Sequence, residues 1–150
     1  MRKVEFGRLN GNNNAVFLAI YSKDYKPWRN TSHKDSIKNL KLNATFMIAR
    51  WDGMIGFPGG FVDKGETLRE AIIREVKEEV NFKFDSEMLQ EEITIEMEGL
   101  NTHLFSIEVD NNVLIHIQKD IINSLHYEEE IVGSKLIYLT SFDENKGLVN

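Results

Sequence analysis

Hydrophobic and polar positions along the chain predict strands in its first third and a long helix near its middle. The continuous apolar run Ala15–Tyr21 indicates a buried strand. Ala44–Arg50 indicates a second one, and the Asp52-Gly53 pair after it is a strong hairpin signal, with Met54–Phe57 as the returning strand. Weaker patterns add a turn at Gly11–Asn14 and strands at Val4–Arg8, His103–Val109 and Leu136–Leu139.

The segment Thr67–Val80 carries the clearest helical pattern. Thr67 and Glu70 have the spacing of a capping box, and Asn81 readily adopts the left-handed conformation that ends a helix. An apolar stripe along Asn112–Ser124 predicts a second helix. Strands and helices in this mixed order predict an α/β fold with a mixed β-sheet, formed as one domain over residues 1–150.

Three carboxylates share one side of the first predicted helix. Glu75, Glu78 and Glu79 fall within about 100° of one another on a helical wheel. Like charges four residues apart repel, and near the protein interior they are unfavourable unless they are paired or bound to a metal. Clustered hard oxygen ligands suit Mg²⁺ or Mn²⁺, whereas the plainer alternative is a solvated acidic face.

The segment before this helix is rich in glycine. Pro58-Gly59-Gly60 is expected to break regular structure between the hairpin and the helix. Glycine allows the backbone to approach a ligand closely, and a carbonyl at such a position can bind a hard cation. A tight turn is the alternative interpretation of the same residues.

Together these segments carry a recognisable signature. Gly60-Phe61-Val62-Asp63-Lys64-Gly65-Glu66, then seven residues, then Arg74-Glu75-Val76-Lys77-Glu78-Glu79-Val80-Asn81-Phe82, resembles the Nudix box. Asn81 stands where the box has glycine, and Phe82 stands where it has an aliphatic residue. The resemblance implies an α/β/α sandwich with a loop–helix–loop motif and a hydrolase that cleaves phosphoanhydride bonds.

The resemblance also implies a metal site. The backbone carbonyl of Gly59 and the carboxylates of Glu75, Glu78 and Glu79 would bind Mg²⁺ or Mn²⁺ ions, which neutralise phosphate charge and activate a water molecule. A carboxylate then takes the proton of that water. Glu75, Glu79 and a glutamate outside the box, for which Glu130 is the candidate, are alternative bases. The alternative for Glu130 is a solvated acidic loop.

Other box residues are expected to support this site. Arg74 would hold the carboxylates in place through charge-assisted hydrogen bonds. By resemblance, Glu66 would support the loop, and Gly60 and Gly65 would shape it. Asn81 would preserve the helix end, because asparagine is the next best residue after glycine for a left-handed cap.

A longer stretch, FMIARWDGMIGFPGGFVD at Phe46–Asp63, resembles one branch of the family, the snoRNA-decapping and inosine-diphosphatase enzymes. In that branch an arginine and a phenylalanine upstream of the box contact the nucleotide base, and they correspond to Arg50 and Phe57. The alternatives are a surface charge for Arg50 and core packing for Phe57. The base-contacting histidine of the branch has no counterpart in the aligned residues Asn14-Ala15-Val16.

A second candidate for substrate binding is the basic segment Ser22–Asn43, which is too long for a simple connection. Its part Lys23–Asn30 interleaves cations with aromatic rings, a pattern that suits phosphates beside a stacked base. Lys26 and Arg29 are therefore predicted to contact substrate, either in a lid over a dinucleotide or along a capped RNA. The alternative is a solvated loop in which Trp28 packs on the sheet.

Composition narrows the remaining classes. The net charge of −6 argues against nucleic-acid binding through a general positive field, and the absence of cysteine excludes disulfides and thiolate metal sites. No apolar run reaches the roughly 18 residues that span a bilayer, and the N-terminus lacks the apolar region of a signal peptide. A cytoplasmic protein is expected. Abundant asparagine, lysine and isoleucine suit an AT-rich genome such as that of a phage. For a phage protein, the expected location would be the cytoplasm of the host.

Two classes of function follow. The first is a Mg²⁺- or Mn²⁺-dependent pyrophosphohydrolase acting on ADP-ribose or on dinucleotides such as NAD, FAD and diadenosine polyphosphates, with removal of an NAD or nucleotide cap from RNA as an alternative. The second is a nucleotide- or RNA-binding module without turnover. The intact Arg74-Glu75 and Glu78-Glu79 pairs speak against this second class. Homodimers are common among relatives, which makes a homodimer one expected state.

Overall fold

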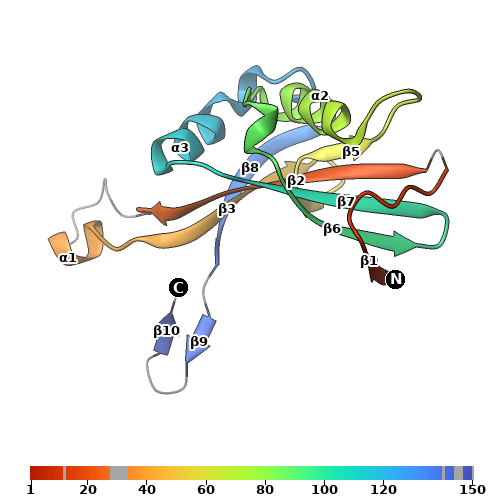
Figure 1. Cartoon of the computed structure of the whole chain (residues 1–150). Coiled ribbons are helices and arrows are strands. Elements are labelled where there is room, and N and C mark those ends of the chain that lie inside the picture. Colours follow the sequence, from red (N-terminus) through yellow and green to blue (C-terminus); the bar gives the residue numbers. More distant parts are fainter. Residues whose placement is uncertain (12, 28–33, 140, 144–146, 150) are drawn as a thin grey trace.

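A computed structural model describes the chain except residues 12, 28–33, 140, 144–146 and 150 (Figure 1). The strands are β1 (Arg2–Val4), β2 (Asn14–Tyr25), β3 (Leu42–Arg50), β4 (Ile55–Gly56), β5 (Gly59–Phe61), β6 (Gln90–Met97), β7 (Leu100–Glu108), β8 (Ile131–Leu139), β9 (Ser141–Asp143) and β10 (Gly147–Val149). The helices are α1 (Asp35–Lys38), α2 (Leu68–Val80) and α3 (Asn111–Asp120), with short 3₁₀ turns at Ser86–Met88 and Ile121–Asn123.

Eight strands form one mixed sheet in the order β1-β6-β7-β2-β3-β4, with β5 paired to β2 and β8 paired to β3. Strands β2 and β7 run parallel, and the other pairs in this sheet are antiparallel. A separate two-stranded sheet contains β9 and β10. The expected α/β fold with a mixed sheet is therefore confirmed.

Strands β2 and β3 pair only along part of their length. Beyond the pair Ile20↔Phe46, the first half of β2 pairs instead with β5, and the end of β3 pairs with β4. The two short strands thus occupy the space between β2 and β3, and Leu18 N–H donates to the carbonyl of Pro58 within it (2.9 Å). Consequently the loop that leads into α2 starts from the middle of the sheet.

Helices α2 and α3 lie over the same face of the sheet (Figure 1). Alternate residues of the central strands, including Leu18, Ile20 and Phe46, are fully buried beneath them. From α2 the core receives Ala71, Ile72, Val76 and Val80, and from α3 it receives Leu114 and Ile117. Because burying a large aliphatic side chain contributes about 1.5–3 kcal/mol, this packing fixes the position of α2 over β2.

The caps of α2 agree with the sequence pattern. Thr67 and Glu70 form both hydrogen bonds of the capping box, and Asn81 ends the helix in the left-handed conformation (φ 54°). The hairpin at Asp52-Gly53 is also confirmed, since β3 pairs with β4 and Gly53 has a φ of 84°. None of the described helices is long and apolar enough to cross a membrane.

Several predicted boundaries are wrong. Gly59-Gly60 was expected to break regular structure, but it lies in β5, because neighbouring β2 supplies the backbone partners. The segment Ser22–Asn43 is less irregular than expected, since β2 continues to Tyr25 and β3 begins at Leu42. The first strand is Arg2–Val4, earlier than Val4–Arg8. Strand β6 is not among the predicted strands, because its charged residues mask its few apolar positions.

Candidate active site

The carboxylate of Glu79 is tied to the backbone of the loop before the helix. Its Oε2 accepts a 2.7 Å hydrogen bond from Gly59 N–H, and Glu79 is only 4% exposed. Residues on either side of Gly59 in the sequence, at even-numbered positions, make the hydrogen bonds to β2. Leu18 N–H donates to Pro58 C=O, and Val62 N–H donates to Asn14 C=O. Since paired and unpaired residues alternate along an antiparallel strand, the backbone groups of Gly59 face away from β2, toward α2.

Glu79 lies where a negative charge is unfavourable. Burial raises its pKa to about 7, and the charges of Glu75 and Glu130 act in the same direction. The Gly59 N–H and the positive charge of Arg50 oppose this rise. Burial also raises the pKa of Glu75, although its bond to Arg74 acts against that rise. The cluster therefore holds more negative charge than its own cations neutralise.

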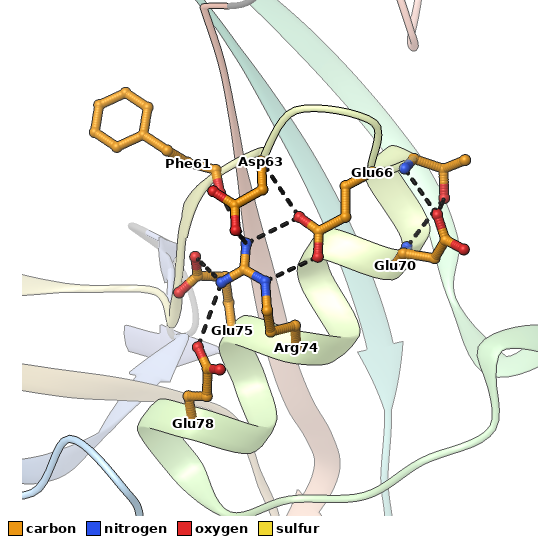
Figure 2. Close-up of polar contacts among 8 residues, drawn as sticks. Phe61, Asp63, Glu66, Glu70, Arg74, Glu75 and Glu78 are labelled. Carbon is orange, nitrogen blue, oxygen red and sulfur yellow. Dashed lines mark hydrogen bonds and ion pairs between the residues drawn. The ribbon is translucent and has the colours of Figure 1, made fainter.

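Arg74 connects the helix to the loop and to two of the carboxylates (Figure 2). Its Nη1 donates to Glu75 Oε1 (2.8 Å) and to Glu78 Oε2 (3.3 Å). Its Nε and Nη2 donate to the two oxygens of Glu66 (2.8 and 2.9 Å), and Nη2 also donates to the carbonyl of Phe61 (3.1 Å). This hydrogen bonding lowers the pKa of Glu66 and raises that of Arg74, so both groups are charged near neutral pH.

Two glycines allow this arrangement, Gly60 through space and Gly65 through its backbone conformation. A Cβ on Gly60 would stand 2.6–2.8 Å from the carboxylate atoms of Glu75, so only glycine allows that side chain its present position. Gly65, in the loop before α2, has a φ of 91°, which L-residues rarely adopt. Glu66 fixes the same loop by accepting a 3.1 Å hydrogen bond from Asp63 N–H.

The donor set fits a hard divalent cation by its chemistry: three glutamates and a glycine backbone provide only oxygen ligands, and their negative charge is under-compensated. In the described part of the chain, however, no three acidic or imidazole groups converge closely enough to hold a metal ion as they stand. Arg74 draws Glu75 and Glu78 toward its guanidinium, while Glu79 turns to Gly59 N–H. Metal binding would thus require a rotation of these side chains.

Glu130 lies on a tight turn that is braced between α2 and the hairpin. The carbonyl of His126 accepts hydrogen bonds from the N–H groups of Glu129, Glu130 and Ile131, while His126 N–H donates to the carbonyl of Glu78 (3.2 Å). On the other side, Trp51 N–H donates to the carbonyl of Glu130 (3.2 Å). His126 is thus the centre of this turn through its backbone, a structural role that no local sequence pattern marks.

The predicted base contacts lie at the same end of the sheet. Arg50 ends β3, with Nη2 3.2 Å from Asp52 Oδ2, and its charge acts on Glu79. Phe57 is half-buried between β4 and β5. Lys26 is not brought to this site: it follows the far end of β2, nine residues and about 30 Å beyond Phe17, the partner of Gly59. Arg29 falls outside the described residues.

A buried histidine lies beside the position where the branch histidine has no counterpart. His103 Nε2 is 3.2 Å from Asn14 Oδ1, and His103 Nδ1 is 2.8 Å from Thr94 Oγ1. Burial lowers the pKa of His103, which favours the neutral ring. Because His103 is fully buried, its role here is to connect β7 to the start of β2.

Comparisons with known proteins agree with this geometry. The family model Nudt16-like, U8 snoRNA-decapping enzyme-like, matches residues 20–150. The chain belongs to this branch of the Nudix family. A U8 snoRNA-decapping enzyme of Homalodisca vitripennis is 32% identical over 96 residues, which are 61% of this chain and 51% of the relative. The chain thus spans about half the length of the curated relative that it matches.

Solved structures show the same fold at low sequence identity. A MutT/nudix family protein from Enterococcus faecalis has a TM-score of 0.60 and 15% identity, covering 92% of this chain and 48% of its own. A second, from Listeria innocua, has a TM-score of 0.53 and 14% identity, covering 85% of this chain and 78% of its own. These likenesses support the Nudix fold of this Nudt16-like chain.

Proposed function

We propose that this protein is a divalent-metal-dependent pyrophosphohydrolase that cleaves a phosphoanhydride bond next to a nucleoside. One observation carries the proposal: a buried glutamate, Glu79, feels the charges of Glu75 and Glu130 in a cluster with more carboxylates than cations, next to a glycine backbone. A divalent cation relieves that excess charge. When bound, Mg²⁺ or Mn²⁺ would neutralise phosphate oxygens and activate the attacking water.

The residues of the chain have separate parts in this proposal. Glu75, Glu78, Glu79 and the Gly59 carbonyl would hold the metal. Each carboxylate that is not bound to the metal could take the proton from water, and Glu130 is the candidate outside the helix. Arg74 would orient Glu75 and Glu78, since a guanidinium with several bonded carboxylates limits their rotation.

The nucleotide would lie at the end of the sheet where β4 and β5 separate β2 from β3. Arg50 and Phe57 border this region and would contact the base. A cavity of about 560 Å³ adjoins Arg74 and Glu78 on the outer side of α2, where Lys77 also lines it. Glu78 is the one proposed metal ligand that lines this cavity, which offers room for part of a bound substrate there.

Removal of a nucleotide cap from RNA is the favoured physiological reaction within this class. The matching family model is described as U8 snoRNA-decapping enzyme-like, and the relative from Homalodisca vitripennis as a U8 snoRNA-decapping enzyme. ADP-ribose and dinucleotides contain the same kind of bond and remain substrates to compare. A cap differs from them in carrying an RNA chain, which requires contacts outside the site described above.

The purified protein should be incubated with ADP-ribose, NAD and a capped RNA, each with Mg²⁺, with Mn²⁺ and with EDTA. The expected result is metal-dependent release of a nucleoside monophosphate or diphosphate, which chromatography would quantify. Glu79→Gln should abolish most of the release while leaving the fold intact. Binding of these compounds without cleavage under every metal condition would instead identify a nucleotide- or RNA-binding module.

A further inference from the structure

Three large apolar side chains at the β3–β4 hairpin are exposed to solvent. Trp51, Met54 and Ile55 are 70%, 64% and 48% exposed, and we call them the hairpin patch. We propose that the hairpin patch, with Trp51 at its centre, is a stacking site for a second nucleobase of the substrate. This inference rests on the proposed function and extends it to substrates that carry two bases.

The backbone under Trp51 is held in place by several hydrogen bonds. Arg50 N–H donates to the Met54 carbonyl (2.9 Å), Gly53 N–H donates to the Arg50 carbonyl (3.0 Å), and Met54 N–H donates to Asp52 Oδ1 (3.0 Å). In a hairpin fixed in this way, only the side-chain torsions of Trp51 remain to be ordered when a ligand binds. Such preorganisation favours binding of a planar ligand.

The hairpin patch adjoins the carboxylate site. Trp51 N–H donates to the carbonyl of Glu130, and Arg50 precedes Trp51 directly in the chain. Glu130 and Arg50 are the two hairpin-side residues whose charges act on Glu79. A dinucleotide with its diphosphate at the carboxylates therefore has the hairpin patch within reach of one of its two nucleosides.

The chemistry of the patch suits a base better than a protein partner. An indole ring stacks on every nucleobase, because each base has a π-face. Three side chains expose on the order of 400 Å², whereas a stable protein interface buries about 800 Å² on each partner. The patch is large enough for one base and too small for a subunit interface.

NAD and ADP-ribose provide a matched pair of probes, because they share the adenosine diphosphate ribose and differ in the nicotinamide ring. Trp28 and Trp51 are the two tryptophans of the chain. In a Trp28→Phe, Glu79→Gln background with Mg²⁺, indole fluorescence would report Trp51 alone, without turnover. We expect NAD to quench this fluorescence strongly and ADP-ribose to quench it weakly.

Titration calorimetry on the Glu79→Gln protein should then compare Trp51→Ala, Trp51→Phe and Ile122→Ala. Ile122→Ala is the control, because Ile122 is also exposed (61%) but belongs to the 3₁₀ turn after α3. Trp51→Ala should raise the Kd for NAD about 5- to 150-fold, in line with the strength of base stacking, and leave that for ADP-ribose within twofold. Trp51→Phe should recover most of the affinity, and Ile122→Ala should change neither ligand.

Equal NAD affinity of Trp51→Ala and the parent protein would overturn the stacking site. So would a change in molar mass by light scattering with Trp51→Ala, because the patch would then be an interface between copies. If ADP-ribose and NAD both bind but Trp51→Ala leaves the Kd for NAD unchanged, this inference alone is removed. Failure of both nucleotides to bind any variant would remove the proposed function as well.

Discussion

Gly59 donates its backbone N–H to Oε2 of Glu79 across 2.7 Å, although the two residues are 20 positions apart in the chain. The contact exists because β5 lies between β2 and β3, which turns the backbone of Gly59 toward α2. It brings the buried carboxylate and the glycine carbonyl, two of the proposed metal ligands, to the same place. The site is therefore assembled by the insertion of β5 into the sheet.

The substitution Glu79→Gln should raise stability and lower activity together. The amide oxygen can still accept the bond from Gly59 N–H, but the buried charge is gone. With a folded pKa of about 7 against an ordinary value of 4.5, ionised Glu79 destabilises the metal-free fold by about 3 kcal/mol. Urea unfolding in EDTA at pH 8 should show Glu79→Gln to be the more stable protein, and hydrolysis should fall at least a hundredfold.

The sign of the pH dependence follows from the raised pKa. The folded state keeps the proton of Glu79 up to about pH 7, while the unfolded chain loses it near pH 4.5, so stability decreases between these values as pH rises. Glu79→Gln should lack this decrease and unfold like the wild type at pH 4.5. Equal stability of the two proteins at pH 8 would contradict the placement of Glu79.

Arg74→Lys should impair catalysis more than its retained charge suggests. A lysine cannot donate to Glu66, Glu75 and Glu78 at once, as the guanidinium does. We expect kcat/KM to fall roughly 10- to 100-fold and stability to fall by about 1–3 kcal/mol, the worth of hydrogen bonds to charged groups. Arg69→Lys is the matched control, because Arg69 lies on the same helix and pairs with Glu91 instead. Similar losses of activity in both variants would argue against an orienting role for Arg74.

Alanine at the two adjacent glycines should separate folding from function. A Cβ at Gly60 meets the Glu75 carboxylate, a flexible group that can move, so Gly60→Ala should fold and lose activity. A Cβ at Gly59 would stand 2.0 Å from the Val16 carbonyl oxygen at a φ of 145°, so Gly59→Ala should lose several kcal/mol of stability, about 3 or more. Thermal unfolding and hydrolysis of both variants test this. Normal activity of Gly60→Ala would disprove the importance of the Glu75 position.

The end of α2 should tolerate glycine but not alanine. Asn81 has a φ of 54°, a conformation that glycine adopts without strain. Asn81→Ala should lower the free energy of unfolding by about 1 kcal/mol, whereas Asn81→Gly should stay within about 0.5 kcal/mol of wild type. Both variants lose the exposed hydrogen bond from Asn81 Nδ2 to Asp120, because neither alanine nor glycine has a side-chain amide. Equal destabilisation by the two substitutions would show that this bond, and not the backbone conformation, matters.

Glu130→Gln should lower activity and also lower the pKa of Glu79, because one of the negative charges that raise this pKa is removed. Glu129→Gln is the control on the same turn. We expect a drop in kcat of at least tenfold for Glu130→Gln and little change for Glu129→Gln. In EDTA, the pH-dependent loss of stability should move to lower pH in Glu130→Gln alone. If both variants retain full activity, the base is one of the helix carboxylates.

The local sequence pattern was sufficient to predict several elements of this fold. Helix α2 follows from local features: the helical spacing of apolar residues over Thr67–Val80, the capping box and the asparagine at its end. The capping contacts join residues within four positions of one another, so they need no distant partner. The Asp52-Gly53 hairpin is local in the same way. The spacing of the Nudix box, with Glu75, Glu78 and Glu79 on one side of the predicted helix, indicated the Nudix family, and the family comparison confirms that membership.

Tertiary structure decided the rest, since it depends on partners far away in the sequence. The glycine pair before the helix is a strand only because β2 offers it backbone partners, and the charged strand β6 exists because it lies between β1 and β7. The buried state of Glu79 and the turn that holds Glu130 beside the hairpin likewise arise from packing. Sequence determined which side chains the site contains, and long-range backbone pairing determined which of them meet.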